Sequence, residues 1–549
     1  ARAGQNKLRR AGLSAACVAL CLACTALSSC ASSGETSQTG TVGIYTAEQT
    51  SASAADESSV PPQTTAQQTE PVVSAPLPHY SETDIGETEY EPQECSVLYE
   101  AENGTLSGYA AAAAARSGYS GDGYVSGISL PDSKLTIELE IDSPQHYSIT
   151  VCAASDSPVE GVLYVDGLAR GRLYISGSGE FEAVKYENIY LKPDSAVLSI
   201  EELTGECDVD FVLLENSAEI YEHDYSVMGE LCSENSSDSA ARLYKYLCEM
   251  YGEETLSGQQ CTQGSNAEIE AVAGVTGRYP AIRFGELMGY SADVDTGDIE
   301  LAMEYAADGG IVGYVWNWMQ NGSCYADKSG FLLPNAVTDE DVSQMSPDEL
   351  SEALEDERIS PEAYAVIDGI DKIAAQLKRL ADADIPVLFR PLPQAGNSDF
   401  WWNSNRESYL WLYETIYQRL EDYHQLDNLI WVWSAYDTEW YVGDDMCDIV
   451  SLDIYDFSHE AWDNQSYITA MLRLYELFGS KPLAISECNV LPAPANMVRD
   501  NAMWLYTSVW SGEYTLGETG GLSYDYISEA EWIVFYNCSA VIAKDELNQ

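Results

Sequence analysis

Short runs in which apolar and polar residues alternate dominate the chain between Cys95 and about Ser217. Clear examples lie at 135–141, 147–152 and 161–165, and Gly, Asp, Ser and Pro separate them. A period of two places successive side chains on opposite faces of a strand, so that only one face is buried. The density of these short strands predicts an antiparallel β-sandwich over residues 93–217.

A different pattern begins near residue 225, where an apolar run, a loop and an amphipathic helix follow one another repeatedly. Eight such units predict an α/β fold, a (β/α)8 TIM barrel over 218–549. A doubly wound open sheet is the alternative, but no glycine-rich phosphate loop follows any expected strand. Helices are expected at Ser360–Asp382 and Arg406–Tyr423. The expected strands are Tyr225–Glu230, Pro280–Gly285, Gly310–Trp316, Pro386–Pro391, Leu429–Ser434, Asp448–Asp453, Pro482–Glu487 and Leu505–Trp510.

An insertion follows the third expected strand. Residues Ser323–Glu362 carry eleven acidic and two basic residues, a composition typical of a solvated segment. We therefore expect this segment to lie on the surface, outside the core of the barrel.

The N-terminus has the pattern of a secretory signal. Basic residues between Arg2 and Arg10 precede the apolar stretch Ala11–Leu27, which has the length of a secretory signal. The sequence Leu27-Ser-Ser-Cys30 resembles a bacterial lipobox, which predicts lipidation of Cys30 and an exported protein anchored to the cell surface. An ordinary signal peptide that happens to contain Cys is the alternative. Residues 1–30 are thus assigned to the signal, and the Ser-, Thr- and Pro-rich residues 31–92 to a disordered linker.

Composition narrows the possible partners. The chain has 89 acidic and 26 basic residues, a formal net charge of −63, which repels nucleic acid and anionic lipid headgroups. We expect no nucleic acid partner and membrane contact through the lipid anchor only. A neutral polysaccharide is indifferent to this charge, and 37 Tyr and 12 Trp provide rings that either fill cores or stack on sugars. The cysteines beyond the signal show no spacing typical of zinc ligands, and their disulfide pairing stays open.

Candidate chemistry is sought at the carboxyl ends of the barrel strands, where TIM-barrel active sites lie. Strand four continues as Phe389-Arg-Pro-Leu-Pro-Gln-Ala-Gly396, and Asp399-Phe-Trp-Trp402 follows. Strand six leads into Tyr455, and strand seven ends on Glu487. A carboxylate at a strand tip is a candidate nucleophile or acid, although a structural Glu that caps the next loop has the same appearance.

These segments, in this order, resemble glycoside hydrolase family 26, whose best-known members are endo-β-1,4-mannanases. The resemblance covers about Tyr225 to Leu547 and includes Tyr279-Pro-Ala-Ile282, Trp316-Asn-Trp318 and Trp510-Ser-Gly-Glu513. It implies a retaining mechanism that uses two carboxyl groups, with Glu487 as the nucleophile. It also implies roles around the substrate: Tyr455 orients the nucleophile, Arg390 holds a carboxylate, and Trp316, Asn317, Trp402 and Trp510 contact the sugar.

The chain departs from the family pattern at the second carboxyl group. The family has Arg-Pro-Leu-His-Glu after strand four, whereas this chain has Pro393 and Gln394, and Asn317 stands where the family commonly has His. An amide cannot deliver a proton, and general acid–base assistance is typically worth about 10²–10⁴-fold in rate. Three explanations stay open: a natural loss that leaves a binding protein, a replacement acid such as Glu286 or Asp399, or an engineered Gln394.

The sandwich resembles a family 35 carbohydrate-binding module, or the related family 6. The resemblance lies in 99–103, 118–124 and 208–214, and it implies a structural Ca²⁺ held by Glu100, Glu102 and Asp210. Surface acids of a very acidic protein are the alternative. Tyr119 and Tyr124 are candidates for the sugar-binding face.

Together these features predict a monomeric, surface-anchored protein that acts on β-mannan and needs no cofactor for catalysis. Two alternatives remain open. The protein binds mannan or another β-glycan without cutting it, or the same fold acts on mixed-linkage glucan or xylan. Formation of products from soluble mannan distinguishes hydrolysis from binding.

Overall fold

The computed structural model describes residues 76–85, 93–217, 224–456, 462 and 465–547. The predicted signal peptide with Cys30 lies outside the described residues, as does most of the predicted linker. Residues 76–85 differ from the disorder expected of the linker: Thr83 donates its N–H to Asn537 O (2.8 Å) and accepts from Ser539 N (3.0 Å). Among the helices that the structure describes, none combines the length and the apolar character needed to span a bilayer.

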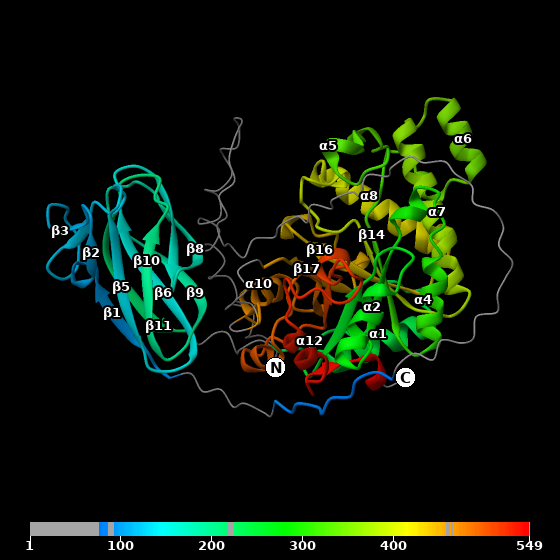
Figure 1. The fold of residues 1–549 in the computed structure, drawn as a ribbon. Coiled ribbons are helices and arrows are strands. Elements are labelled where there is room, and N and C mark those ends of the chain that lie inside the picture. Colours follow the sequence, from blue (N-terminus) through cyan, green and yellow to red (C-terminus); the bar gives the residue numbers. More distant parts are fainter. Residues whose placement is uncertain (1–75, 86–92, 218–223, 457–461, 463–464, 548–549) are drawn as a thin grey trace, which may run out of the picture. The chain divides into compact units, whose positions relative to one another are not determined.

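The region after residue 95 is the predicted β-sandwich (Figure 1). Alternation explains its core: in β5 (Lys134–Ile141) the side chains of Leu135, Ile137, Leu139 and Ile141 are buried, and those between them are more exposed. One sheet has the order β3-β4-β11-β6-β9 with β1 on β11, and the other has the order β2-β5-β10-β7-β8. The other strands are β1 (Ser96–Glu100), β2 (Thr105–Ser107), β3 (Ala111–Ala113), β4 (Tyr124–Ser126), β6 (Gln145–Ala154), β7 (Val159–Val165), β8 (Leu168–Ile175), β9 (Glu182–Leu191), β10 (Asp194–Glu201) and β11 (Asp208–Asn216).

The C-terminal region is an eight-stranded parallel barrel, as predicted. The sheet runs from β13 to β19 in chain order, and β12 closes it by pairing with both β13 and β19. A short further strand, β20 (Val541–Ile542), pairs with the first residues of β12, on the edge opposite β19. The barrel strands are β12 (Thr255–Gln260), β13 (Ile282–Glu286), β14 (Ile311–Trp316), β15 (Val387–Pro391), β16 (Leu429–Ala435), β17 (Ile449–Ile454), β18 (Leu483–Cys488) and β19 (Tyr506–Val509).

Helices surround the strands (Figure 1). The two helices expected from the sequence are confirmed as α7 (Pro361–Ala381) and as α8 (Arg406–Gln418), which continues in a π-helical turn, Arg419–Tyr423. Ser360 and Asn405 begin these helices by accepting a backbone N–H with their side chains, as N-cap residues do. The other longer helices are α1 (Asp238–Met250), α2 (Ala267–Thr276), α4 (Asp298–Ala307), α6 (Pro347–Glu355), α10 (Ile468–Phe478) and α12 (Glu529–Tyr536).

The first barrel strand is not the one expected from the sequence. Residues Tyr225–Glu230 form no strand; the Tyr225 hydroxyl instead donates to Asn501 O (2.6 Å). The strand is Thr255–Gln260, whose sequence TLSGQQ is mostly polar. Two of its polar side chains have backbone acceptors: Ser257 Oγ donates to Ile542 O (2.8 Å), and Gln260 Nε2 donates to Ser486 O (3.0 Å). A search for apolar runs therefore misses this strand.

The acidic insertion is only partly solvated. Its acidic side chains are mostly exposed, but Leu333, Val342, Leu350 and Ala353 are buried in the barrel core. Its first residues also join the loop after strand four, since Ala326 N donates to Asp399 O (2.7 Å) and Trp401 N donates to Cys324 O (3.1 Å). The expectation of a surface segment is thus wrong for the beginning of this insertion, which helps to form the site.

Candidate active site

Glu487 lies at the end of β18 and is almost fully buried. Its two carboxylate oxygens are held separately: Arg390 Nη1 donates to Oε1 (2.6 Å), and the Tyr455 hydroxyl donates to Oε2 (3.0 Å). Charge-assisted bonds of this kind are short and strong, and they fix the orientation of the carboxylate. The structure therefore brings together three of the residues singled out in the sequence, at the carboxyl ends of three strands.

Asp453 completes this charged group. Arg390, at the end of β15, donates from Nη2 to both Asp453 oxygens (2.8 and 2.7 Å) and to Ser434 Oγ (2.9 Å). Burial raises the pKa of Asp453 and the Arg390 guanidinium opposes that shift. The sequence analysis did not assign Asp453 a role; its place two residues before Tyr455, at the tip of strand six, was the available signal.

Gln394 lies beside this charged group with both ends of its amide engaged. Its Nε2 donates to Asp453 Oδ2 (2.9 Å), and its Oε1 accepts from Asn397 Nδ2 (2.8 Å). The backbone is unusual, because Leu392 and Gln394 both adopt positive φ (50° and 58°). Such conformations are costly for residues other than glycine and mark positions that the surrounding structure enforces. The next residue, Ala395, donates its N–H to Ser434 O (2.9 Å) on β16 and so ties this turn to the neighbouring strand.

Asn317, directly after β14, and Glu286, at the end of β13, form a second buried pair. Asn317 donates its backbone N–H to Glu286 Oε1 (3.1 Å) and its side-chain Nδ2 to Oε2 (2.7 Å). Met288 N also donates to Oε1 (2.9 Å). Burial raises the pKa of Glu286 to about 8, the hydrogen bonds lower it, and the charge of Glu487 adds to the rise.

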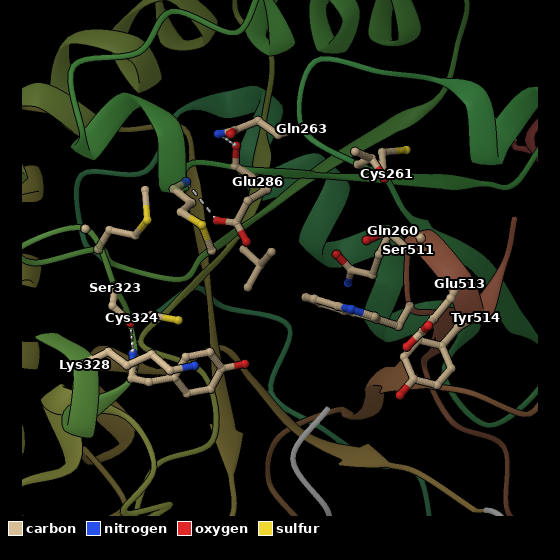
Figure 2. A pocket seen from close by; sticks show the side chains of 18 of the residues that line it. Gln260, Cys261, Gln263, Glu286, Ser323, Cys324, Lys328, Ser511, Glu513 and Tyr514 are labelled. Atoms are coloured by element: carbon tan, nitrogen blue, oxygen red, sulfur yellow. Dashed lines mark hydrogen bonds between the residues drawn. The ribbon is translucent and has the colours of Figure 1, made fainter. Parts of the chain in front are cut away.

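Two adjoining cavities open at these residues. A cavity of about 720 Å³ contains Glu286, between a wall with Ser323 and Cys324 and a wall with Gln260 and Glu513 (Figure 2). A smaller cavity of about 30 Å³ is lined by Asn317, Gln394, Tyr455 and Glu487. Both are also lined by Cys324, Tyr325 and Trp510.

The aromatic residues expected to contact sugar divide into two groups. Trp510 is partly exposed and lines both cavities. Trp316 and Trp402 are fully buried: Trp316 stacks on Trp318 (4.2 Å between ring centroids), and Trp402 stacks on Phe400 (4.6 Å). Other rings cover both indole rings, and neither Trp316 nor Trp402 lines either cavity, so their contact with sugar stays a prediction. Phe400, which the sequence analysis did not single out, lines the smaller cavity in place of Trp402.

Asp399, one of the two candidate replacement acids, is exposed and is not among the lining residues of either cavity. Glu286 lines the larger cavity but not the smaller one with Glu487. Among the described residues that line the smaller cavity, Glu487 is the only carboxylate.

The three acids singled out in the sandwich converge on one turn. Ser120 donates its N–H to Asp210 Oδ1 (2.9 Å) and its hydroxyl to Glu100 Oε2 (2.6 Å), and Asp122 N donates to Glu102 Oε1 (2.9 Å). Burial raises the pKa of Asp210, and the nearby charges of Glu100 and Glu102 add to the rise. Across the described ranges, no three Asp, Glu, His or Cys side chains are already arranged as metal ligands.

Tyr119 and Tyr124, the candidates for a sugar-binding face, lie close together, with ring centroids 5.9 Å apart. Tyr124 is buried, and its hydroxyl accepts from Arg116 N (3.1 Å), whereas Tyr119 is half-buried. Tyr119 is thus the more accessible of the two rings. The ten cysteines in the described ranges are all free thiols.

Comparison with known proteins gives matches over most of the chain. A family model described as glycosyl hydrolase family 26 matches residues 232–546. A mannan endo-1,4-beta-mannosidase of Thermothelomyces thermophilus is 32% identical over 455 residues, which are 80% of this chain and 87% of that protein. A mannan endo-1,4-beta-mannosidase B of a Piromyces species is 27% identical over 472 residues, 82% of this chain and 77% of that protein.

Solved structures agree with this result. The crystal structure of a Podospora anserina GH26-CBM35 β-(1,4)-mannanase superimposes with a TM-score of 0.54 at 28% identity, and it covers 82% of this chain and 98% of that one. A ruminal GH26 endo-β-1,4-mannanase gives a TM-score of 0.59 at 21% identity, over 84% of this chain and 99% of that one. The second likeness shows the fold alone.

Proposed function

The chain belongs to glycosyl hydrolase family 26, and on that premise we propose that it acts on β-mannan as a retaining endo-β-1,4-mannosidase with a severely weakened acid step. The observation that carries this proposal is the bonding of Glu487, which Arg390 and Tyr455 hold at the wall of a cavity that it shares with Gln394. The relatives named above supply the substrate class.

The nucleophile half of the mechanism is supported by geometry. A retaining glycosidase needs one ionised carboxylate that attacks the anomeric carbon. Arg390 donates to Oε1 of Glu487 and Tyr455 donates to Oε2, so both oxygens of the carboxyl group are oriented. When the sugar bonds to Glu487, the Tyr455 hydroxyl stays in place to stabilise the ester oxygen.

The acid half is weakened. The leaving oxygen of a sugar is a poor leaving group, and it needs a proton that the Gln394 amide cannot give. Gln394 Nε2 uses one hydrogen on Asp453 and keeps a second that can donate to the glycosidic oxygen. Such a bond orients the substrate without cleaving it, so we expect strong binding and slow turnover.

This weakness favours one second function. A barrel that holds β-mannan without cutting it would keep Tyr455, Trp510 and the Gln394 amide as binding groups, with Arg390 orienting Glu487. The specific observation in its favour is that both ends of the Gln394 amide are engaged by protein groups, so that position 394 is well fitted as an amide.

The sandwich is proposed to be a carbohydrate-binding module with a structural Ca²⁺. The structure of the Podospora anserina GH26-CBM35 mannanase covers 82% of this chain, and three carboxylates converge on the turn at Ser120. Glu102 Oε2 is buried and has no hydrogen-bond partner among the described residues. A buried oxygen of this kind is available as a ligand for a cation. Glu100, Glu102 and Asp210 would hold the ion, once they turn from the Ser120 and Asp122 donors.

Anchoring at the cell surface by lipidated Cys30 is also proposed. It rests on the basic segment, the apolar stretch and the sequence Leu27-Ser-Ser-Cys30. A tether of about sixty residues rich in Ser, Thr and Pro would then give the folded part reach from the membrane. Polysaccharide bound at the surface would be retained by the cell.

The proposed function is tested by separating the two half-reactions. An activated aryl β-mannobioside has a leaving group that needs no proton, so the protein should release the phenol in a burst and then stall with sugar on Glu487. Azide, a small anion that needs no base, should restore turnover. Glu487→Gln is the matched control, since it keeps the size of the side chain and removes the nucleophile; it should show no burst. Mass spectrometry of the stalled protein should locate one glycosyl group on Glu487.

The alternatives give different results. Binding of manno-oligosaccharides without any burst would establish the non-catalytic function. Binding and burst with gluco- or xylo-oligosaccharides, and none with mannosides, would replace mannan by another β-glycan. Rapid mannan hydrolysis that survives in Glu487→Gln would contradict the assignment of the nucleophile.

A further inference from the structure

The Glu286–Asn317 pair connects the two cavities. Glu286 lines the larger cavity, and Asn317 lines the smaller one beside Glu487. Both side chains are buried, with exposed fractions of 9% and 6%. Asn317 donates hydrogen bonds to the Glu286 carboxyl group from its backbone N–H and from its side-chain Nδ2, so Glu286 holds one end of the side-chain amide.

The two ends of the Asn317 amide differ in what they offer to a ligand. Nδ2 donates hydrogen bonds and Oδ1 accepts them. In the structure Nδ2 is used by Glu286 Oε2, and no hydrogen bond from a described residue reaches Oδ1. The amide oxygen is therefore the end that remains for a ligand in the smaller cavity.

The two oxygens of the Glu286 carboxyl group accept hydrogen bonds from different donors. Oε1 accepts two backbone N–H groups, from Met288 and Asn317, which cannot turn away. Among the described residues, the Asn317 side chain alone donates to Oε2. A proton on this carboxyl group must then sit on Oε2, because Oε1 is committed to accepting.

We propose that Glu286 is a positioning residue that decides which end of the Asn317 amide faces the sugar beside Glu487. An ionised Glu286 attracts Nδ2 and leaves the amide oxygen toward the sugar, as in the structure. A protonated Glu286 donates from Oε2 to the amide oxygen, and the amide turns over to present its nitrogen. This inference rests on the proposed function only in taking the ligand to be a β-linked sugar chain.

The Glu286 carboxyl group, whose proton sets the orientation of the Asn317 amide, titrates within a pH range that is accessible to experiment. Burial raises the pKa of Glu286 to about 8, so the carboxyl group is mostly protonated at pH 6 and ionised at pH 9.5. Glu487 on β18 acts on it electrostatically, and Cys324 lies close enough for the Glu286 charge to raise the pKa of its thiol. The other titratable side chains around the same cavity are Cys261, Tyr325, Lys328, Glu513 and Tyr514.

Substitutions can exchange the carboxyl group of Glu286 and the amide group of Asn317. Glu286→Gln keeps an oxygen for the two backbone donors and places an NH₂ group against Asn317, which holds the amide permanently in the nitrogen-out orientation. Asn317→Asp alone sets two carboxyl groups against each other. In the double variant Glu286→Gln/Asn317→Asp, the Gln amide donates to the Asp carboxylate, whose other oxygen faces the sugar at every pH.

Binding of manno-oligosaccharide to the full-length protein, measured by calorimetry from pH 6 to 9.5, tests the inference. The natural protein should show a step in Kd of about two- to tenfold, the value of one hydrogen bond. Glu286→Gln should match the natural protein at pH 6 and show no step, and the double variant should match it at pH 9.5. Melting temperatures at pH 6 serve as the control for folding. Two results would overturn the inference: a pH-dependent step in Kd that persists in Glu286→Gln, or a loss of affinity in the double variant that equals the product of the losses in the two single variants.

A measurement without sugar separates this inference from the proposed function. In protein labelled with ¹⁵N-asparagine, the NH₂ signal lost in Asn317→Asp identifies the Asn317 amide. That signal should shift with the titration of Glu286 in the natural protein and stay constant in Glu286→Gln. Constancy in both proteins would refute the pairing even if mannan binds. Failure of manno-oligosaccharides to bind, with a titrating amide, would refute only the proposed substrate.

Discussion

Gln394 Nε2 lies 2.9 Å from Asp453 Oδ2 and donates a hydrogen bond to it. A carboxyl group at position 394 would face the Asp453 carboxylate at a similar distance, and two carboxylates so close cannot both be ionised. Gln394→Glu should therefore share a proton with Asp453 and have a raised pKa, as a general acid requires. We expect mannan cleavage to rise by about 10²–10⁴-fold, measured as kcat/KM for reducing ends released.

The pH profile provides the control for this prediction. Activity of Gln394→Glu should fall as pH rises through the upper pKa of the shared pair, because the proton is then lost. Adding Asp453→Asn should move that fall to lower pH, since the neighbouring negative charge is gone. A folded Gln394→Glu with no gain on mannan would show that Pro393 and Asn317 also block the acid step.

Glu286 should make the stability of the protein depend on pH. Its pKa is raised from 4.5 to about 8 on folding, so the folded state holds a proton that the unfolded state releases between these pH values. The free energy of unfolding should thus fall as pH rises through this window, by at most about 5 kcal/mol at about 1.4 kcal/mol per pH unit. Glu286→Gln should flatten this part of the curve, which denaturant titrations at pH 5, 7 and 9 would measure. Equal slopes for the two proteins would contradict the raised pKa.

Calcium should stabilise the sandwich. Binding to the native state alone contributes about 2.7 kcal/mol at a concentration a hundredfold above Kd. Chelation with EDTA should lower the melting temperature of the full-length protein, and added Ca²⁺ should restore it. Asp210→Asn removes one ligand charge and little volume, and it should make melting insensitive to both additions. A natural protein that is equally insensitive would eliminate the calcium site.

The lipid anchor should be visible in fractionation. Expressed in a bacterium that processes lipoproteins, the protein should partition into the detergent phase. Cys30→Ala removes the acceptor thiol and should move the protein to the aqueous or unprocessed fraction, while Cys30→Ser provides a closer match in size and polarity. Detergent partitioning that both variants retain would exclude lipidation of Cys30.

The fold was largely predictable because most strands follow simple patterns of hydrophobic residues. The seven later barrel strands are apolar runs, and the β-sandwich strands alternate. The first barrel strand was not predictable this way, because Ser257 and Gln260 are polar yet buried, and each donates to a backbone carbonyl of another strand. The prediction that the acidic insertion lies on the surface failed for the opposite reason. Its many acidic residues indicated a solvated segment, although apolar side chains such as Leu333 and Leu350 enter the core.

The site was predictable where a residue stands at a strand tip and has a partner on another strand. Glu487, Arg390 and Tyr455 meet as expected. Trp402 shows the limit of such reasoning, because a motif gives the residue but not whether Phe400 covers its ring. Asp453 shows another limit: its role follows from Arg390 Nη2, which only the folded chain brings to it.

Closure of the barrel through β12 has a consequence for the folding rate. Leu256 pairs with Tyr506, and Thr255 pairs with Val541, so the ring closes only when segments about 250 to 290 residues apart in the chain meet. Contacts of such long sequence separation form late and slowly, since the entropy of the intervening loop is lost before they stabilise the fold. On the ribosome the barrel therefore cannot close until nearly the whole chain has emerged. Until then β12 has no partner strands. Its Thr, Ser and Gln side chains should keep this unpaired segment soluble, whereas an apolar strand would tend to aggregate.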